Sequence, residues 1–131
     1  MERETRQRTA IRSVVERSER PLSALEVLAA AQAQVAGLGI ATVYRNLKAL
    51  AESGALTVVS LAGANPRYEA SRQGHHHHHF MCIACDRVFD VHSCPGSVLD
   101  VAPKGFTVER HELTLYGRCK DCPPALAPAA G

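Results

Sequence analysis

The stretch that decides the fold is Ala41-Thr-Val-Tyr-Arg-Asn-Leu-Lys-Ala-Leu-Ala-Glu-Ser-Gly54. Four of its apolar residues recur at the three- and four-residue spacing of a single helical face. They are Val43, Leu47, Leu50 and Ala51. This spacing predicts a helix that buries that face, with Gly54 placed to end it. Tyr44, Arg45 and Lys48 are left on the open face, where they are accessible to a partner.

Two further helices are predicted upstream of this stretch. The apolar face of the first consists of Ala10, Ile11, Val14 and Val15. The second begins at Ser23, because Ser23 and Glu26 have the spacing of a capping box. The residues expected on its buried side are Leu25, Leu28 and Ala29. Gly37 and Gly39 are expected to end this helix.

Two short strands are predicted downstream, over residues 55–61 and 67–69, on either side of a Gly-Ala-Asn-Pro turn. Three helices followed by such a hairpin are typical of a winged helix-turn-helix domain, whose third helix enters the DNA major groove. From these residues alone, a small three-helix domain with solvated Arg and Lys side chains is an equal alternative.

The composition narrows the function classes. Fifteen Lys and Arg against 13 Asp and Glu give a formal net charge of +2, which excludes a polybasic arm or an acidic tail. The most apolar stretch, residues 29–41, is interrupted by glutamines and glycines and falls far short of the about 20 apolar residues of a membrane span. The first residues are charged and lead into no apolar core, so no secretory signal is predicted and we expect a cytoplasmic protein.

Charge and ligand-type side chains are unevenly distributed. Residues 1–74 carry ten basic and seven acidic side chains, whereas residues 75–131 carry five and six. All seven His and all five Cys lie in the second half. The organisation that we expect is a winged-helix domain over 1–70 with a hinge at about 62–74, a metal-binding domain over 75–122 and a disordered tail over 123–131.

Two Cys-x-x-Cys pairs, Cys82 with Cys85 and Cys119 with Cys122, are separated by 33 residues. Each short turn presents two sulfurs to one ion, and four thiolates in this arrangement are typical of a structural Zn²⁺ site. The alternative is a pair of redox dithiols or disulfides, which a reducing cytoplasm disfavours.

A run of five histidines, His75–His79, leads into the first Cys pair. An engineered affinity tag has the same composition, but tags are terminal and this run is internal. In a strand, alternate His side chains would share one face, and two imidazoles on one face converge on one ion. Partners are available in Glu69, Asp90, His92 and His111. Asp90 and His92 are expected on one side of a second strand, and His111 at the start of a third.

Together these segments resemble the ferric uptake regulator (Fur) family of bacterial metal-sensing repressors, in the same order over residues 5–122. The segments that carry the resemblance are Ala41-Thr-Val-Tyr-Arg-Asn-Leu47, Arg67-Tyr-Glu69, His75–His79, Cys82-x-x-Cys85 and His111-x-Leu-x-Leu-Tyr-Gly-x-Cys-x-x-Cys122. The resemblance implies an α+β fold, with an N-terminal winged helix-turn-helix followed by a small α/β dimerisation domain that holds a four-cysteine zinc site. It implies a homodimer that binds palindromic operator DNA and represses metal-uptake or stress genes when metal is bound, and not an enzyme or a membrane protein.

The resemblance also implies roles for individual residues. The structural zinc ligands correspond to Cys82, Cys85, Cys119 and Cys122. A regulatory metal site between the two domains corresponds to Glu69, His77, His79 and Asp90. A further site that some members use corresponds to His76, His78 and His111. Tyr44 and Arg45 correspond to the pair that contacts bases, and we expect phosphate contacts from Arg6, Arg8 and Lys48.

Three departures from the family pattern bear on the metal. The His that many members place before the second helix corresponds to Pro21 here, which leaves about four regulatory ligands and favours tetrahedral Zn²⁺ over Fe²⁺ or Mn²⁺. The segment from Cys94 to Phe106 is short, so the dimerisation helix near residues 97–101 is expected to be truncated. Cys94 itself is an additional thiol, which we expect to be inert or accessory.

We therefore expect a dimeric, zinc-responsive repressor of the zinc-uptake type. The alternative is an iron- or peroxide-responsive repressor of the same family, which Asp at position 90 favours and Pro21 disfavours. A zinc hydrolase or deaminase is a distant alternative. It lacks a His-Glu-x-x-His pattern, and His111 and Glu112 would point to opposite faces of a strand.

Overall fold

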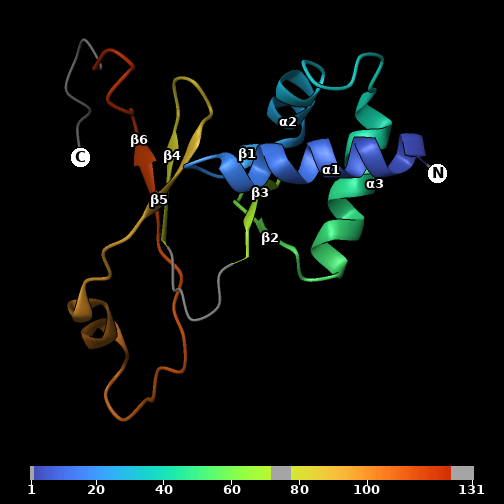
Figure 1. Ribbon diagram of the computed structural model, residues 1–131. Helices are drawn as coiled ribbons and strands as arrows, with labels where there is room; N and C mark the ends of the chain where they lie inside the picture. Colours follow the sequence, from blue (N-terminus) through green and yellow to red (C-terminus); the bar gives the residue numbers. More distant parts are fainter. Residues whose placement is uncertain (1, 72–77, 125–131) are drawn as a thin grey trace. The chain divides into compact units, whose positions relative to one another are not determined.

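The computed structural model describes residues 2–71 and 78–124. The chain forms two compact units, over residues 1–74 and 75–131, and each is described by itself (Figure 1). Most of the expected tail, from residue 125 on, lies outside the described residues. Within the described ranges, no helix is long and apolar enough to cross a membrane.

The first unit is built on three helices, α1 (Glu2–Arg17), α2 (Ala24–Ala31) and α3 (Ile40–Glu52). Their apolar faces meet in one core together with residues of the adjoining strands. The buried core residues are Ile11, Val14, Val15, Leu22, Ala24, Val27, Ala31, Leu38, Val43, Leu47, Leu50, Leu56 and Tyr68. The predicted faces of α1 and α3 are confirmed, although Ala51 is only partly buried. Gly54 follows α3 with φ 85°, the left-handed conformation that glycine adopts without strain.

Helix α2 begins as predicted but buries a different face. Ser23 Oγ accepts a hydrogen bond from the Glu26 N–H, and the Glu26 carboxylate accepts one from the Ser23 N–H, which completes the capping box. The buried residues are Ala24, Val27 and Ala31. The predicted face was wrong, since Leu25 is 64% exposed, Ala29 is exposed and Leu28 is only partly buried. Small side chains at three- and four-residue spacing face the core here, and they are a weaker hydrophobic signal than Leu.

Helix α2 also ends earlier than predicted. Its last residue is Ala31, and Gln32 forms the C-cap. Gln32 Nε2 donates to the Leu38 carbonyl (3.1 Å), which closes the turns that lead to α3. Gly37, with φ 82°, therefore lies within this connection and not at the helix end.

A three-stranded antiparallel sheet completes the first unit, in the order β1-β3-β2. The strands β2 (Leu56–Val59) and β3 (Arg67–Ala70) form the predicted hairpin. The short strand β1 (Leu22–Ser23) was not predicted, and it pairs with the other side of β3. Part of the expected hinge, residues 67–70, is therefore strand.

The second unit contains a three-stranded sheet in the order β5-β4-β6. The central strand β4 (His78–Cys82) pairs antiparallel with β5 (Val88–Val91) and parallel with β6 (Thr114–Gly117). His111 was expected to open the last strand, but it lies three residues before β6, because pairing with β4 begins only at Thr114. Helices and sheets are thus segregated along the chain, and the α+β fold is confirmed.

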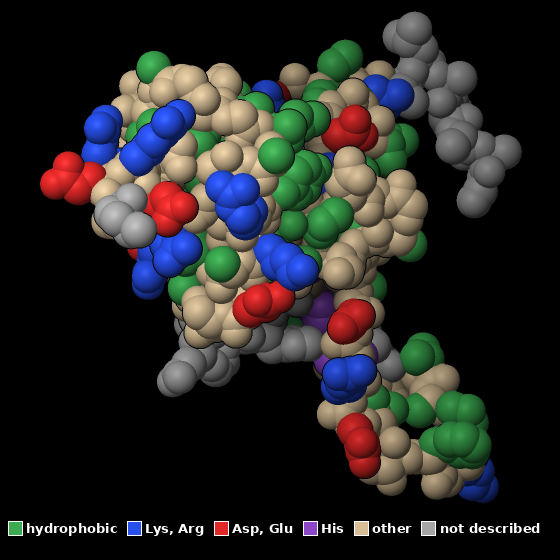
Figure 2. Space-filling view, turned by 90° about the vertical axis from the view of Figure 1, so that its right-hand side faces the viewer, with side chains coloured by type: hydrophobic (Ala, Val, Ile, Leu, Met, Phe, Trp, Pro, Cys, Tyr) green, Lys and Arg blue, Asp and Glu red, His purple; other side chains and the backbone are tan. Residues whose placement is uncertain are grey.

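Residues 92–113, which we call the apolar excursion, leave the sheet between β5 and β6 (Figure 1). They contain one short 3-10 helix, η1 (Gly96–Val101), where a truncated helix was expected. Figure 2 shows apolar side chains gathered on this excursion. The exposed ones are Leu99, Val101, Phe106 and Val108. Such a group is typical of a surface that contacts another protein.

Candidate metal centres and DNA-contact surface

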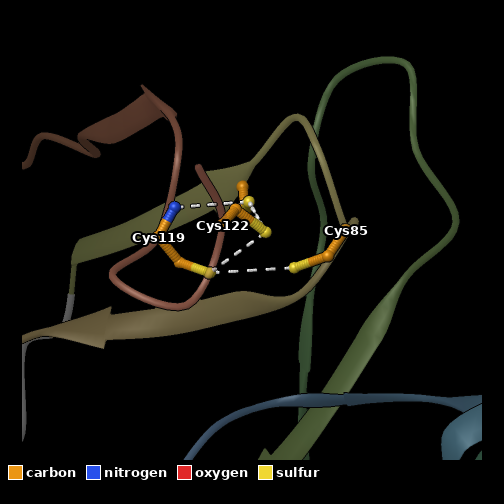
Figure 3. A group of neighbouring side chains, drawn as sticks. Cys85, Cys119 and Cys122 are labelled. Atoms are coloured by element: carbon orange, nitrogen blue, oxygen red, sulfur yellow. Dashed lines mark hydrogen bonds between the residues drawn. The ribbon is translucent and has the colours of Figure 1, made fainter. Parts of the chain in front are cut away.

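The two Cys pairs come together in the second unit, and Figure 3 shows three of the sulfurs turned toward one another. The sulfur of Cys82 lies 3.7 Å from that of Cys122, and the sulfur of Cys119 lies 3.9 Å from Cys85 and 3.6 Å from Cys122. Four sulfurs bound tetrahedrally to one Zn²⁺ at about 2.3 Å are about 3.8 Å apart. Disulfide sulfurs are about 2.05 Å apart, and all five cysteines are free thiols. The cluster therefore fits a four-cysteine zinc site.

Local turns direct these sulfurs inward. In the turn between β4 and β5, Asp86 adopts φ 63° and its N–H donates to the Cys82 carbonyl (2.9 Å). In the second pair, the Cys122 N–H donates to the Cys119 carbonyl (3.1 Å). Burial by itself would raise the pKa of the Cys82 thiol, but backbone N–H donors, Cys119 foremost, outweigh it and lower that pKa to about 6. The thiolate form that metal binding requires is thereby favoured.

His79 and Asp90 form a second ligand pair. They are register partners on β4 and β5, so their side chains lie on the same face of the sheet. His79 Nε2 lies 3.4 Å from Asp90 Oδ1, and only 16% and 13% of the two side chains are exposed. A nitrogen and an oxygen bound to one tetrahedral Zn²⁺ are about 3.4 Å apart. The pair therefore has the dimensions of two ligands of one ion.

The remaining members of the expected regulatory set are not placed in this pair by the second unit alone. Glu69 lies on β3 of the first unit, and His77 is outside the described residues. Pro21, which stands where many relatives have a ligand, is fully buried in the first unit and has no side-chain donor atom. The roles of Glu69 and His77 stay predictions.

A third group of ligand atoms lies on the other face of the same sheet. His78 directly precedes His79 in β4, so the two imidazoles point to opposite faces. His78 Nε2 lies 3.1 Å from His111 Nε2 and 3.3 Å from Cys94 Sγ, which is itself 3.1 Å from His111 Nε2. His76, the other residue expected at this site, is outside the described residues.

The open face of α3 carries the side chains predicted to contact DNA. Tyr44 is 43% exposed, and Arg45 and Lys48 are exposed beside it. Arg6, on α1, is also exposed. Figure 2 shows Lys and Arg side chains interspersed with Asp and Glu, so no continuous basic surface is visible on that face.

One polar contact that sequence analysis missed joins α1 to α3. Arg8 Nε donates to Asn46 Oδ1 (3.3 Å), and Asn46 Nδ2 donates to the Thr42 carbonyl (2.9 Å). Asn46 is only 6% exposed. The available signal was its position next to Leu47 in the apolar stripe, because a buried amide needs hydrogen-bond partners.

The model of the ferric uptake regulator family matches residues 2–116 of the chain. The chain belongs to this family. Fur family proteins are metal-sensing transcriptional regulators and not enzymes. The four-cysteine cluster and the winged-helix arrangement are thus found in a chain of this family.

Individual Fur family relatives cover most of the chain. It is 31% identical to the peroxide operon regulator of Bacillus subtilis over 122 residues, which are 90% of the chain and 82% of that protein. It is 32% identical to the ferric uptake regulation protein of Synechococcus elongatus over 94 residues, 68% of the chain but only 63% of that protein. A solved structure of a zinc-bound manganese uptake regulator is similar with a TM-score of 0.76 at 28% identity, and the match covers 86% of this chain and 87% of the other.

Proposed function

We propose that this Fur family chain is a zinc-responsive transcriptional repressor that binds palindromic DNA as a cytoplasmic homodimer. The observation that supports this most directly is the His79–Asp90 pair, whose 3.4 Å separation suits a tetrahedral ion. The same chain carries an exposed Tyr-Arg-Lys face on α3. In the proposal, Cys82, Cys85, Cys119 and Cys122 hold structural Zn²⁺.

The regulatory ion is proposed to bind Glu69, His77, His79 and Asp90. When bound, it supplies coordination bonds that join Glu69 of the first unit to the ligands of the second. These ligands then restrict the spacing of the two α3 helices in a dimer, which must be about 34–36 Å, or a multiple, to match two half-sites. Because metal binds that arrangement more tightly, metal affinity and DNA affinity are linked.

Zn²⁺ is proposed over Fe²⁺ and Mn²⁺ because of the ligand number. Pro21 contributes no ligand, so about four protein ligands remain, and four-coordinate tetrahedral binding is typical of Zn²⁺. The names of the relatives do not choose between metals, since they refer to iron, peroxide and manganese.

The DNA and dimer contacts follow from exposed side chains. Tyr44 and Arg45 are proposed to contact base edges, with Arg6, Arg8 and Lys48 on phosphates. The dimer is proposed to form through the apolar excursion and β6, where Leu115 and Tyr116 are exposed. Burying these side chains against a second chain would supply core that the second unit lacks by itself.

The test is operator binding followed by fluorescence anisotropy at fixed salt, because phosphate contacts make affinity salt-dependent. The probe is a duplex selected from a random pool by the zinc-loaded protein. Zn²⁺ is expected to raise affinity at least about tenfold over protein that keeps only its structural zinc. Asp90→Ala should lose this response and Ser93→Ala should keep it. Metal-independent binding by the wild type would refute the proposal.

An iron- or peroxide-responsive repressor is the second candidate. Two observations favour it, the Asp at position 90 and the 31% identity to the peroxide operon regulator of Bacillus subtilis. In that case, peroxide treatment of the Fe²⁺-loaded protein should add one oxygen atom to a peptide that contains His77 or His79. Mass spectrometry that finds no such gain would leave the zinc-responsive function as the better account.

A further inference from the structure

We propose that Cys94, together with His78 and His111, forms a third metal site that takes a Zn²⁺-class ion through one thiolate and two imidazoles. This site goes beyond the proposed function, which uses neither Cys94 nor this face of the sheet. The three ligand atoms approach one another from three separate segments of the second unit, namely β4 and the two ends of the apolar excursion.

The separations of the three atoms are close to those of a coordinated ion. Two imidazole nitrogens on one tetrahedral Zn²⁺ are about 3.3 Å apart, and a nitrogen and a thiolate sulfur about 3.6 Å. The observed values are 3.1 Å between the two nitrogens and 3.1 and 3.3 Å from nitrogen to sulfur. An ion would enter with each separation lengthening by about 0.2–0.5 Å. Cys94 is exposed, so its side chain has room for that movement.

The sheet positions His78 for this role. The His78 side chain is only 1% exposed, and its Nδ1 accepts a hydrogen bond from the Leu113 N–H (3.1 Å). The Leu113 carbonyl in turn accepts one from the His79 N–H (3.1 Å). These bonds hold the ring at the junction of β4 and the segment before β6, with Nε2 directed toward Cys94 and His111.

The same hydrogen bond determines where the proton lies without metal. Because Nδ1 accepts from Leu113, a neutral His78 carries its proton on Nε2, which donates to the sulfur or to His111 Nε2. A bound ion takes the place of this proton and of the Cys94 thiol proton, and both are released to solvent. The metal-free state is therefore a hydrogen-bonded triad in which all three atoms already face one point.

The donor set indicates which ions suit the site. A thiolate with two imidazoles favours Zn²⁺ and similar borderline ions over Mg²⁺ or Mn²⁺, which prefer oxygen. Three protein ligands leave one position for water. His79 and Asp90 lie on the opposite face, so an ion here is separate from the regulatory ion.

The place of the ligands in the chain suggests what the ion does. Cys94 and His111 are 17 residues apart and flank most of the apolar excursion. An ion that links them closes the base of the excursion and reduces the conformational freedom of the chain between them. The exposed Leu99, Val101 and Phe106 lie in that segment. Occupancy is therefore expected to order the surface that a second chain would cover.

Cobalt provides a probe that reports thiolate ligation. Full-length protein is treated with a chelator until only the structural zinc remains, and is then titrated with Co²⁺ while zinc content is measured. The proposed regulatory set contains no cysteine, so a thiolate-to-Co²⁺ charge-transfer band can arise only from Cys94 as long as the zinc of the four-cysteine site is retained. We expect this band in the wild type and in Ser93→Ala, and its loss in Cys94→Ser. His111→Ala should weaken Co²⁺ binding at this site at least about tenfold.

A wild-type titration with no thiolate band, or a band that survives in Cys94→Ser, would overturn the proposal and leave only the hydrogen-bonded triad. Alkylation of the wild type gives a second readout that needs no variant. Zn²⁺ should slow modification of Cys94 at least about tenfold, and an unchanged rate would also overturn the site. Asp90→Ala separates the two functions, because it should abolish the DNA response and keep the charge-transfer band.

Discussion

Removing zinc from the four-cysteine site is expected to unfold the second unit while the first unit stays folded. The first unit has a core of 13 buried residues drawn from all three helices and the sheet. Among the described residues of the second unit, the only buried apolar side chains are Cys82 and Val88. The second unit therefore depends on its metal far more than the first.

The magnitudes support this asymmetry. Burying Val88 contributes about 1.5–3 kcal/mol, whereas a structural Zn²⁺ contributes about 10–16 kcal/mol in zinc-finger peptides at neutral pH. A whole domain is stable by only about 5–15 kcal/mol. Loss of the zinc therefore exceeds what the remaining contacts of the second unit can offset.

Cys119→Ser is the perturbation of choice, because Cys119 contacts the sulfurs of Cys85 and Cys122 and its N–H contacts Cys82. Loss of one ligand should weaken zinc binding by more than about 100-fold. Hydrogen exchange read by NMR should lose protection at the Cys82 N–H, which donates to the Arg87 carbonyl (2.9 Å), and keep it in α1 and α3. Cys94→Ser is the control, since it leaves the four-cysteine cluster intact. Zinc-free protein that keeps protection at Cys82 would refute the reasoning.

Three further predictions concern the first unit. Gly54→Ala should cost about 1–2 kcal/mol in a thermal melt, because φ 85° strains a residue with a Cβ although that Cβ would meet no atom within 4 Å. Burial would raise the pKa of Glu26, but its hydrogen bonds to Arg20 and Ser23 outweigh burial and lower it. Its charge therefore stabilises the fold above about pH 4.5, the usual value, and this contribution is lost as pH falls through the lower folded pKa. The stability difference between wild type and Glu26→Gln in urea should accordingly shrink at acid pH, and a constant difference would contradict this account. Arg45→Ala should weaken operator binding by about 1–3 kcal/mol and relax base preference. Lys48→Ala should instead reduce the salt slope by about 0.9, and identical anisotropy profiles for the two variants would argue against their separate roles.

The helices that could be predicted from sequence are those with large apolar side chains in register. In α1 and α3, Ile11, Val15, Val43 and Leu47 mark the buried face without ambiguity. In α2 the buried stripe is mostly alanine, and the exposed Leu25 gave a stronger but misleading signal. Which face a short helix buries depends on neighbours that its own residues do not reveal.

The same limit applies to the metal ligands. The four-cysteine cluster follows from two local Cys-x-x-Cys turns, so its membership could be predicted from spacing. The contacts of Cys94 could not, because they depend on His78 and His111, which are brought close by the pairing of β4 with β6. Nothing in the residues around Cys94 indicates that pairing.

The parallel pairing of β4 with β6 has a consequence for how the chain is made. His79 lies opposite Thr114, so the pairing joins residues 35 positions apart, and such non-local contacts form slowly. The helices of the first unit make more local contacts and leave the ribosome first. Each nascent chain therefore completes its DNA-contact surface before Cys119 and Cys122 have been synthesised. The zinc supply at the moment of translation then determines how long a chain exists with that surface folded and its metal-binding unit still unfolded.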